Sequence, residues 1–533
     1  MYRSRPAQLS LMLFGFLAAL RPVAGQVTTA QYGNARIGVA ATETILTPAN
    51  VRPDRFGRVA SYPVDGPVYA QPLYLPRTDW AGHPATAALF VATEHGSVYA
   101  FDAGGSGTDP IWQRAFIDAA NGVTAVPARD VGCPFLAPEI GITSTPVIDP
   151  AAGTLYVLMR TREPGHSGAY RYVQRLHALD LRDGHDRIPP VAIDAQAPGS
   201  CDGSDGGVIA FDPLRENPRA ALLLAKGVVS LAWGSSCDVG PYHGWVMAYD
   251  SRTLQQLGAL NVSPNGSAAG IWQGDAGLAA DSAGNVFVVT GNGSFDDGRT
   301  PGDYGNTVLK LGLTQSGFVV RDYFTPSEQA ALSGSDEDLG SSGPILLSDQ
   351  AGTHRRLLFV AGKNGKSFLI DRDAMGHFHC DNNAHAVQVL TTSLGGFGAS
   401  AFWHHTLYVW GSDSTLLAYP LRGGRIKGPP ISATVRSTDP GAVPVISANG
   451  DRAGIVWAIE TRTWQGDEHA AILHAFDALD VRHELFNSEM KGSRDRAGEG
   501  TRFAIPTVAG GRVFVGGRDR VDVYGLLGEG PRP

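Results

Sequence analysis

The sequence predicts an all-β fold: one eight-bladed β-propeller of four-stranded antiparallel blades, with the ring closed by an N-terminal strand. A mostly apolar hexapeptide that ends in a turn recurs eight times along the chain. An apolar run, rich in β-branched residues, precedes each copy. The 67 glycines and 34 prolines fit the many tight turns that join short strands. Short strands repeated in units around an axis are typical of propellers. The hexapeptides occupy residues 98–103, 176–181, 246–251, 308–313, 367–372, 416–421, 473–478 and 521–526.

Each unit is predicted to contain four strands in sequence order. The first strand carries small residues that suit the crowded axis, as at residues 141–146, 340–344 and 395–398. The hexapeptide is the third strand, and a looser fourth strand follows it. A solenoid or a two-layer sandwich is the structural alternative for such a series of short strands. The second, strongly apolar strands are predicted at residues 89–93, 155–159, 228–233, 286–290, 357–361, 407–410, 455–459 and 513–515.

The eighth unit ends at Leu527 without a fourth strand of its own. Residues 56–64 read as an isolated strand ahead of the first unit. This strand is predicted to complete the eighth blade and close the ring, which would leave no open sheet edge there.

The first 25 residues resemble a signal peptide. Arg3 and Arg5 give a positive start, residues 9–20 are apolar, and residues 23–25 are small, as a cleavage site requires. The apolar run is too short to span a bilayer, and no later run reaches that length, so we expect cleavage rather than anchoring. Residues 26–533 are then a single propeller domain, exported to the periplasm or secreted.

The charge balance argues against one class of partner. The formal net charge is -8, and nucleic-acid binding requires a basic surface. We expect no nucleic acid, no membrane span and a monomer.

Unusual polar residues gather in one class of loop. In a propeller, loops between second and third strands lie on the same face as the connections between blades. Polar side chains from these loops would converge on a central funnel, which is a natural ligand site. The loops comprise residues 94–96, 234–244, 291–306, 362–366 and 464–469.

Several motifs between residues 230 and 378 resemble the core of quinoprotein alcohol dehydrogenases. Those enzymes are eight-bladed propellers that hold pyrroloquinoline quinone (PQQ) and a calcium or lanthanide ion. The start of the mature chain, from residue 32 to residue 51, is also similar to that family. The motifs are Ser-Ser-Cys-Asp-Val-Gly at 235–240, Gly-Ile-Trp at 270–272, Thr-Gly-Asn at 290–292, Gly-Asp-Tyr-Gly-Asn at 302–306, Asp-Glu-Asp at 336–338 and Lys-Asn-Gly at 363–365.

The resemblance implies roles for eight residues. The oxygen-bearing side chains are those that a hard cation prefers, an aromatic plane would orient a flat cofactor, and a carboxylate near the cation could take the proton of an alcohol. The implied metal ligands are Asp238, Asn292, Asp336 and Asp338, with Asp336 also the catalytic base; the implied PQQ contacts are Trp272, Lys363, Ser235 and Asn364.

The chain departs from the family pattern at its cysteines. The family's adjacent cysteine pair, a small disulfide ring over the quinone, is absent, and a single Cys133 stands near that place. Asp238 also replaces the usual glutamate. Because both would lie on funnel-side loops, Cys133 is expected to pair with Cys237, with Cys201 as the rival partner.

These observations favour an exported PQQ- and metal-dependent dehydrogenase that oxidises an alcohol or a sugar. No Cys-x-x-Cys-His motif for haem attachment occurs, so such an enzyme would need an external electron acceptor. A non-catalytic binding or scaffold propeller is the main alternative. A polysaccharide hydrolase or lyase acting through His95 and His243 is a third reading, for which the sequence shows no matched pair of acids.

Overall fold

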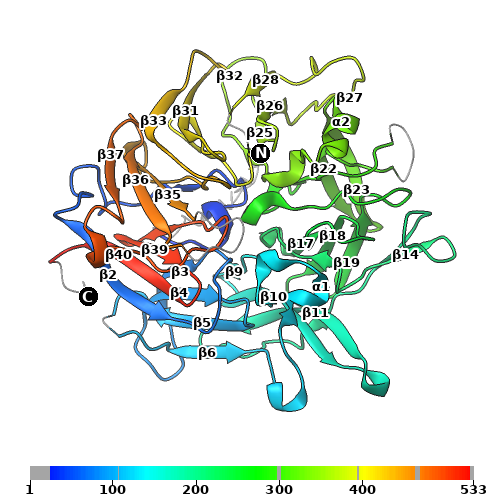
Figure 1. Ribbon diagram of the computed structural model, residues 1–533, viewed down its shortest axis with the longest axis horizontal. Coiled ribbons are helices and arrows are strands. Elements are labelled where there is room, and N and C mark those ends of the chain that lie inside the picture. The colour runs from blue at the N-terminus through cyan, green and yellow to red at the C-terminus, as the bar shows by residue number, and fades with distance from the viewer. Residues whose placement is uncertain (1–24, 106, 297–301, 393–394, 462–468, 529–533) are drawn as a thin grey trace, which may run out of the picture.

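The computed structural model describes residues 25–105, 107–296, 302–392, 395–461 and 469–528. Eight antiparallel sheets stand around a common axis and form the predicted eight-bladed propeller (Figure 1). The first four blades contain β3 (Leu73–Thr78), β4 (Thr86–Ala92), β5 (Ser97–Asp102) and β6 (Trp112–Ala115); β9 (Val147–Asp149), β10 (Thr154–Pro164), β11 (Tyr170–Asp180) and β12 (Val191–Ala192); β16 (Leu223–Ala225), β17 (Val228–Ser235), β18 (Trp245–Asp250) and β19 (Gln256–Asn261); and β20 (Ala279–Ala280), β21 (Val286–Val289), β22 (Val308–Thr314) and β23 (Gly317–Thr325).

The other four blades follow in chain order. They contain β24 (Ile345–Leu346), β25 (Leu357–Ala361), β26 (Lys366–Asp371) and β28 (Gln388–Thr391); β29 (Ala401–Trp403), β30 (Thr406–Val409), β31 (Thr415–Arg422) and β33 (Ile431–Arg436); β34 (Val445–Asn449), β35 (Arg452–Glu460), β36 (Ile472–Asp477) and β37 (Glu484–Asn487); and β38 (Thr507–Ala509), β39 (Arg512–Gly516), β40 (Arg520–Leu526) and β2 (Phe56–Pro63).

The remaining elements are short and lie on or between the blades. The strands are β1 (Val39–Ala40), β7 (Val126–Pro127), β8 (Glu139–Ile140), β13 (Gln196–Pro198), β14 (Val208–Ala210), β15 (Glu216–Asn217), β27 (His377–Phe378) and β32 (Arg425–Ile426). The helical turns are η1 (Ala30–Tyr32), η2 (Ala119–Asn121), α1 (Ala128–Val131), η3 (Pro134–Leu136), η4 (His166–Gly168), η5 (Gln273–Asp275), α2 (Gln329–Gly334), η6 (Leu339–Ser341) and η7 (Gly492–Arg494).

Every predicted hexapeptide coincides with the third strand of its blade, and at most its last residue lies beyond the end of the strand. In β18, for example, Trp245 to Tyr249 are all buried, because neighbouring blades cover both faces of the sheet. Burial on two faces explains why the repeat reads as a nearly continuous apolar run rather than a strict alternation.

The N-terminal strand closes the ring as predicted. β2 pairs antiparallel with β40, with Phe56 opposite Leu526 and Tyr62 opposite Val521. Phe56 is fully buried, and its ring centroid lies 5.5 Å from that of Trp457 in the seventh blade. The closing strand is therefore fixed by packing as well as by backbone pairing.

The small-residue segments precede the innermost strands rather than forming them, which corrects the sequence prediction. Residues 141–146 end just before β9, and residues 340–344 just before β24. A Cβ atom on Gly340 would lie 2.5 Å from the carbonyl carbon of Thr290 in the preceding blade. The small residues are thus needed where the backbones of adjacent blades approach most closely, outside the sheet ladder.

An N-terminal strap, residues 27–43, crosses the middle of the ring, where Figure 1 shows its dark blue trace. The guanidinium of the fully buried Arg36 donates to the carbonyl oxygens of Leu222 and Leu278, which fixes the strap against the third and fourth blades. The strap hydrogen-bonds to all eight blades, in order through Tyr74, Ile148, Leu224, Ala280, Leu346, Phe402, Ile446 and Gly511.

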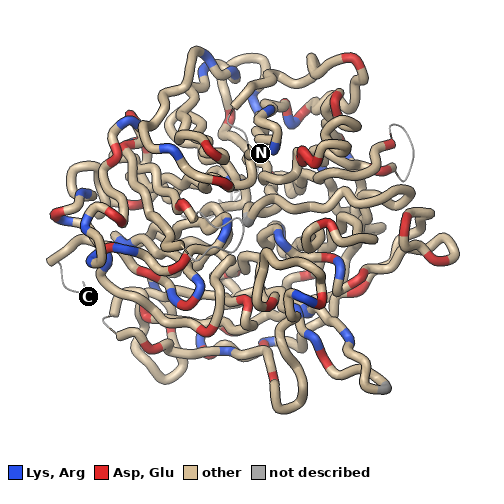
Figure 2. Tube along the Cα trace, in the orientation of Figure 1, with Lys and Arg blue, Asp and Glu red and all other residues tan. Residues whose placement is uncertain are grey.

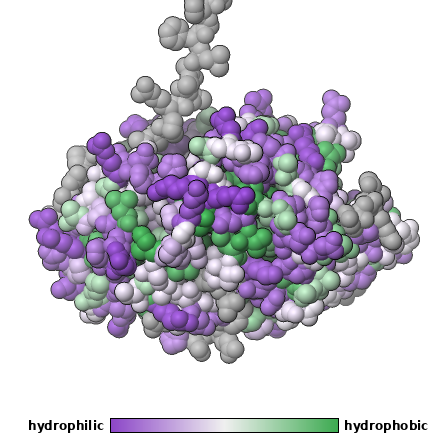
Figure 3. Space-filling view, turned by 90° about the horizontal axis from the view of Figure 1, so that it is seen from above, coloured by the Kyte–Doolittle hydropathy of each residue, from purple (hydrophilic) through white to green (hydrophobic). Residues whose placement is uncertain are grey.

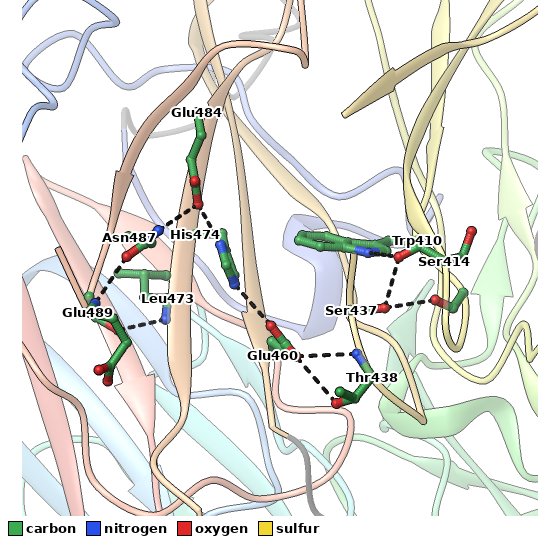
Figure 4. A network of polar contacts seen from close by, with 12 residues as sticks. Trp410, Ser414, Ser437, Thr438, Glu460, Leu473, His474, Glu484, Asn487 and Glu489 are labelled. Carbon is green, nitrogen blue, oxygen red and sulfur yellow. Dashed lines mark hydrogen bonds and ion pairs between the residues drawn. The ribbon is translucent and has the colours of Figure 1, made fainter. Parts of the chain in front are cut away.

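A buried histidine links three strands of the seventh blade (Figure 4). In β36, His474 Nδ1 lies 2.7 Å from Glu484 Oε1 and its Nε2 lies 3.3 Å from Glu460 Oε2. Burial lowers the pKa of His474, but the two glutamates outweigh it and raise that pKa above its usual value. His177, at the same place in the second blade's hexapeptide, lies with its Nδ1 atom 2.8 Å from Asp186 Oδ1.

The surface is polar and mixed in charge. Figure 2 shows basic and acidic residues interspersed around the ring, and Figure 3 shows apolar residues in small groups among hydrophilic ones. Exposed large apolar side chains, such as Val59, Tyr170 and Leu479, come from different blades. Among the described residues, no helix is long and apolar enough to cross a membrane. The predicted signal peptide lies outside the described residues except for Gly25, and so does most of the predicted loop at 464–469.

Candidate functional site

One cavity of about 220 Å³ collects most of the residues that the sequence singles out. Two of its polar residues follow the second strands of their blades, Asp238 after β17 and Lys363 after β25. Asn292 follows the second strand β21 of the blade between them; it is not part of the cavity lining but is hydrogen-bonded to Asp336 and Asp338. Asp336 and Asp338 lie between α2 and η6, in the connection from the fourth to the fifth blade. The cavity lining includes Ser235, Asp238, Trp272, Asp336, Asp338 and Lys363.

The indole ring of Trp272 packs against the main chain of three glycines. A Cβ atom added to Gly234, Gly270 or Gly291 would lie 2.8 to 3.1 Å from an atom of the indole ring. Side chains at these three positions would displace the ring, so the glycines let it pack directly on the main chain. The indole also lines the cavity, as the predicted floor for a flat cofactor requires.

Lys363 bridges two carboxylates in the cavity. Its Nζ atom lies 2.8 Å from Asp336 Oδ2 and 3.6 Å from Asp338 Oδ2. The backbone N–H of Lys363 also donates to the carbonyl oxygen of Asp338 at 3.0 Å. The lysine thus places a positive charge between the two aspartates.

Asn292 connects the same two aspartates from the neighbouring blade. Its backbone N–H donates to Asp338 Oδ1 at 2.7 Å, and its Nδ2 donates to Asp336 Oδ1 at 3.0 Å. Its Oδ1 accepts a hydrogen bond from Asn306 Nδ2 at 3.0 Å. The Asn306 side chain also accepts from the N–H of Leu339, which joins this loop to the start of η6.

Asp238 approaches from the third blade in an unusual backbone conformation. Cys237 and Asp238 have φ values of 55° and 54°, in the left-handed region that non-glycine residues seldom adopt. Tyr242 donates its hydroxyl to Asp238 Oδ1 at 2.6 Å, and the N–H of Asp238 donates to Ser235 Oγ at 3.0 Å. Ser235 therefore accepts a hydrogen bond from the backbone of Asp238 as well as lining the cavity.

The three carboxylates repel one another. Burial, together with the charges of Asp336 and Asp238, raises the pKa of Asp338 to about 6 despite the opposing Asn292 N–H and Lys363. Burial and the charge of Asp336 likewise raise the pKa of Asp238, against the Tyr242 hydrogen bond and Lys363. One lysine does not compensate three acids, so the cluster would be stabilised by a further positive charge.

The donor set fits a hard cation. Carboxylate and amide oxygens are the ligands that calcium prefers, and Asp238, Asn292, Asp336 and Asp338 supply them. Over the described part of the chain, no three His, Cys, Asp or Glu side chains already converge as a metal site. A cation would therefore have to displace the Lys363 ammonium from Asp336 and Asp338.

The cavity's other walls carry aromatic and cationic side chains. The Arg502 guanidinium lies 4.5 Å from the centre of the Phe135 ring, and that of Arg219 lies 5.1 Å from the centre of the Phe503 ring. All four residues line the cavity, as does Phe397. These walls suit a flat, anionic ligand.

Comparison with solved structures identifies the same architecture elsewhere. A quinohemoprotein alcohol dehydrogenase from Comamonas testosteroni superposes with a TM-score of 0.58 at 15% identity, covering 95% of this chain and 81% of that one. The dehydrogenase ADHIIG from Pseudomonas putida HK5 gives 0.62 at 14%, covering 96% and 82%. A europium-containing methanol dehydrogenase gives 0.61 at 12%, covering 95% and 99%. The chain has the fold of the quinoprotein alcohol dehydrogenases. The sequence matches no protein-family model and no curated protein.

The predicted disulfide between Cys133 and Cys237 is present. Cys133 is bonded to Cys237, with their Cα atoms 5.5 Å apart, and the rival Cys201 is a buried free thiol. Both bonded cysteines line the cavity together with Trp272. The bridge joins a cap between the first and second blades, residues 126–140, to the loop that carries Asp238.

Asn364 does not line the cavity. Its Oδ1 accepts a hydrogen bond from the N–H of Lys366 at 2.9 Å, the geometry of a turn residue before β26. Its proposed contact with a cofactor would need a movement of this turn.

The two histidines of the hydrolase reading lie apart from the cavity lining. His95 Nδ1 is 2.5 Å from Glu139 Oε1. His243 is buried, with its ring nitrogens 2.8 Å from Ser263 Oγ and 3.0 Å from the carbonyl oxygen of Asp202. Both histidines thus have structural partners.

Sequence reasoning missed several residues of the site. Tyr242 lies in the same loop as Asp238, and its place four residues later was the available signal. Arg219, Arg502 and Phe503 gave no signal, because they reach the cavity from segments far away in the sequence.

Proposed function

We propose that this chain is an exported PQQ-dependent dehydrogenase that uses a calcium or lanthanide ion to oxidise an alcohol or a sugar. One observation supports the proposal: Asp238, Asp336 and Asp338 line one cavity with Trp272, and Asn292 is hydrogen-bonded to two of these three aspartates. The shared propeller fold supports it.

In this proposal the residues of the site have three roles: binding the cation, orienting the cofactor and accepting a proton. Asp238, Asn292, Asp336 and Asp338 hold the cation, while Trp272 and Lys363 orient the cofactor. A bound PQQ would supply the acceptor for the hydride, one proton with two electrons, that leaves the carbinol carbon, and a bound cation would supply Lewis-acid polarisation. Asp336, whose side chain is 71% exposed, takes the substrate's hydroxyl proton on Oδ2.

Export is part of the proposal. The basic and apolar start of the chain and the Cys133–Cys237 bridge both fit an oxidising compartment. Because the sequence has no haem attachment motif, electrons would leave to an external acceptor.

Reconstitution tests the proposal directly. The mature protein is incubated with PQQ and either calcium or lanthanum, desalted, and examined for quinone absorbance and for dye reduction with a panel of alcohols and aldose sugars. We expect retained cofactor and cation-dependent turnover. No retention at micromolar PQQ would refute the proposal and leave the non-catalytic binding propeller as the remaining reading.

The role of Asp336 has its own test. Asp336→Asn should retain PQQ but lose turnover by about 100-fold or more, the scale of a general base. Asp349→Asn is the matched control, because Asp349 is exposed, lies outside the cavity lining and pairs with a surface arginine, Arg355, at 3.4 Å. Undiminished turnover in Asp336→Asn would exclude Asp336 as the base.

A further inference from the structure

We propose that the Cys133–Cys237 disulfide and Tyr242 together form a positioning device that holds the Asp238 carboxylate in the cavity. Cation and cofactor retention would then depend on the oxidation state of this bridge. The inference rests on the proposed function in one respect, namely that Asp238 is a cation ligand.

The bridge acts on the residue next to the aspartate. It joins cysteines that are 104 residues apart, and Cys237 directly precedes Asp238. On the other side, Cys133 belongs to the cap, whose Phe135 carbonyl oxygen accepts hydrogen bonds from Tyr69 and Arg502. A covalent bond thus anchors the Asp238 loop to a segment that is itself fixed on the first and eighth blades.

The backbone conformation of the loop is intrinsically unfavourable, so it has to be restrained by its surroundings. Two consecutive residues, Cys237 and Asp238, are left-handed without being glycine. Conformations of this kind persist only when the surrounding structure restrains them. Without the bridge, the pair is free to relax toward ordinary backbone angles, which would rotate the aspartate side chain away from Asp336 and Asp338.

Tyr242 restrains the carboxylate itself. Its ring is buried and meets Trp272 edge-on, with centroids 6.1 Å apart, and its hydroxyl donates to Asp238 Oδ1 at 2.6 Å. A hydrogen bond to one oxygen orients the whole group, so we assign Oδ2 to the cation. Asp238 is one methylene shorter than the glutamate of the resembling family, and a fixed loop would compensate for the shorter reach.

Hydrogen exchange tests the anchor without any ligand. The peptide spanning residues 235–242 is followed in the oxidised protein and in the Cys133→Ser/Cys237→Ser double variant, with Cys380→Ser, an exposed free thiol, as the control. We expect exchange in this peptide to rise at least about tenfold in the double variant and not in the control. If the double variant does not fold, the oxidised protein is compared with the same protein after reduction.

Cation affinity tests the consequence. Calorimetric titration with calcium and with lanthanum should show about tenfold weaker binding for the double variant and for Tyr242→Phe, a loss within the range known for groups that orient metal ligands. Unchanged exchange or unchanged affinity in the double variant would overturn the inference. If the oxidised wild type binds neither cation, the proposed function fails, and exchange alone then decides whether the bridge holds the loop.

Discussion

The ammonium nitrogen of Lys363 lies 2.8 Å from Asp336 Oδ2, so the cavity already contains one positive charge at the carboxylate proposed as the base. The side chain of Asp336 is 71% exposed, and a pair so open to solvent is worth only about 0.2–1 kcal/mol. A divalent or trivalent cation can therefore displace the lysine from the aspartate at small cost.

Lys363→Gln should strengthen cation binding to the cofactor-free protein by about two- to fivefold. The lysine ammonium would no longer compete with the cation for Asp336 and Asp338, and would no longer repel it. Calorimetric titration with calcium measures the change. Lys427→Gln, an exposed lysine outside the cavity lining, is the control. Weaker cation binding in Lys363→Gln would mean that the lysine organises the ligands rather than substituting for the ion.

Gly291→Ala should disturb the site and the fold together. The added Cβ would overlap Asp338 Oδ1 and lie 2.8 Å from Trp272 Cδ1. We expect a loss of about 1–3 kcal/mol in the free energy of unfolding, as for other overpacked positions, measured by urea denaturation. In Gly334→Ala the new atom meets nothing within 4 Å, so no loss is expected there. Equal stability of the two variants would contradict the close packing of Trp272 against the backbone of Gly291.

Phe56→Ala should weaken the closure of the ring. The side chain is fully buried against Trp457, Phe486 and Tyr524, and its loss should cost about 3–5 kcal/mol. Val59→Ala on the same strand is the control, because Val59 is 44% exposed and should change stability by less than about 0.5 kcal/mol. Comparable urea midpoints for the two variants would show that β2 is dispensable for closure.

Glu484→Gln should destabilise the seventh blade in a pH-dependent way. The pKa of His474 is raised above its usual 6.5, so the stabilisation from its charged form is fully present below pH 6.5 and is lost as the pH rises through the raised pKa. The variant should therefore lose about 1–2 kcal/mol at pH 6 and less at pH 9. Urea titrations at several pH values measure this difference, with Glu489→Gln, at an exposed pair with Arg496, as the control. A loss of unfolding free energy in Glu484→Gln that grows with pH would contradict this prediction.

The sequence predicted the ring well because blade packing constrains it strongly. A strand buried on both faces must be apolar along its length, which makes the hexapeptides readable, and residues 56–64 were recognisable because no neighbouring strand in sequence could pair with them. The same pattern located Asp238, Asn292 and Lys363 after second strands, so the topology explains why Asp238 and Lys363 line one cavity and why Asn292 reaches the aspartates there.

Other features had no local signature. Small residues at 141–146 suit a close approach between blades, and composition does not distinguish this from an inner strand. The sequence around Asn364 is compatible both with a turn residue and with a cofactor contact. Its hydrogen bond with the N–H of Lys366 identifies it as a turn residue. Arg219 and Arg502 depend on how distant segments meet, which short-range patterns do not encode.

The N-terminal strap constrains the order in which the parts of the propeller can pair during synthesis and folding. Tyr32 donates its hydroxyl to the carbonyl oxygen of Pro506, a contact that spans 474 residues. The ribosome makes the strap and β2 before any blade, yet their last partners, in β38 and β40, are made at the end. These early segments must stay unpaired with the eighth blade until synthesis is nearly complete. Completion of the ring is thus a non-local step that depends on strands from the two ends of the chain.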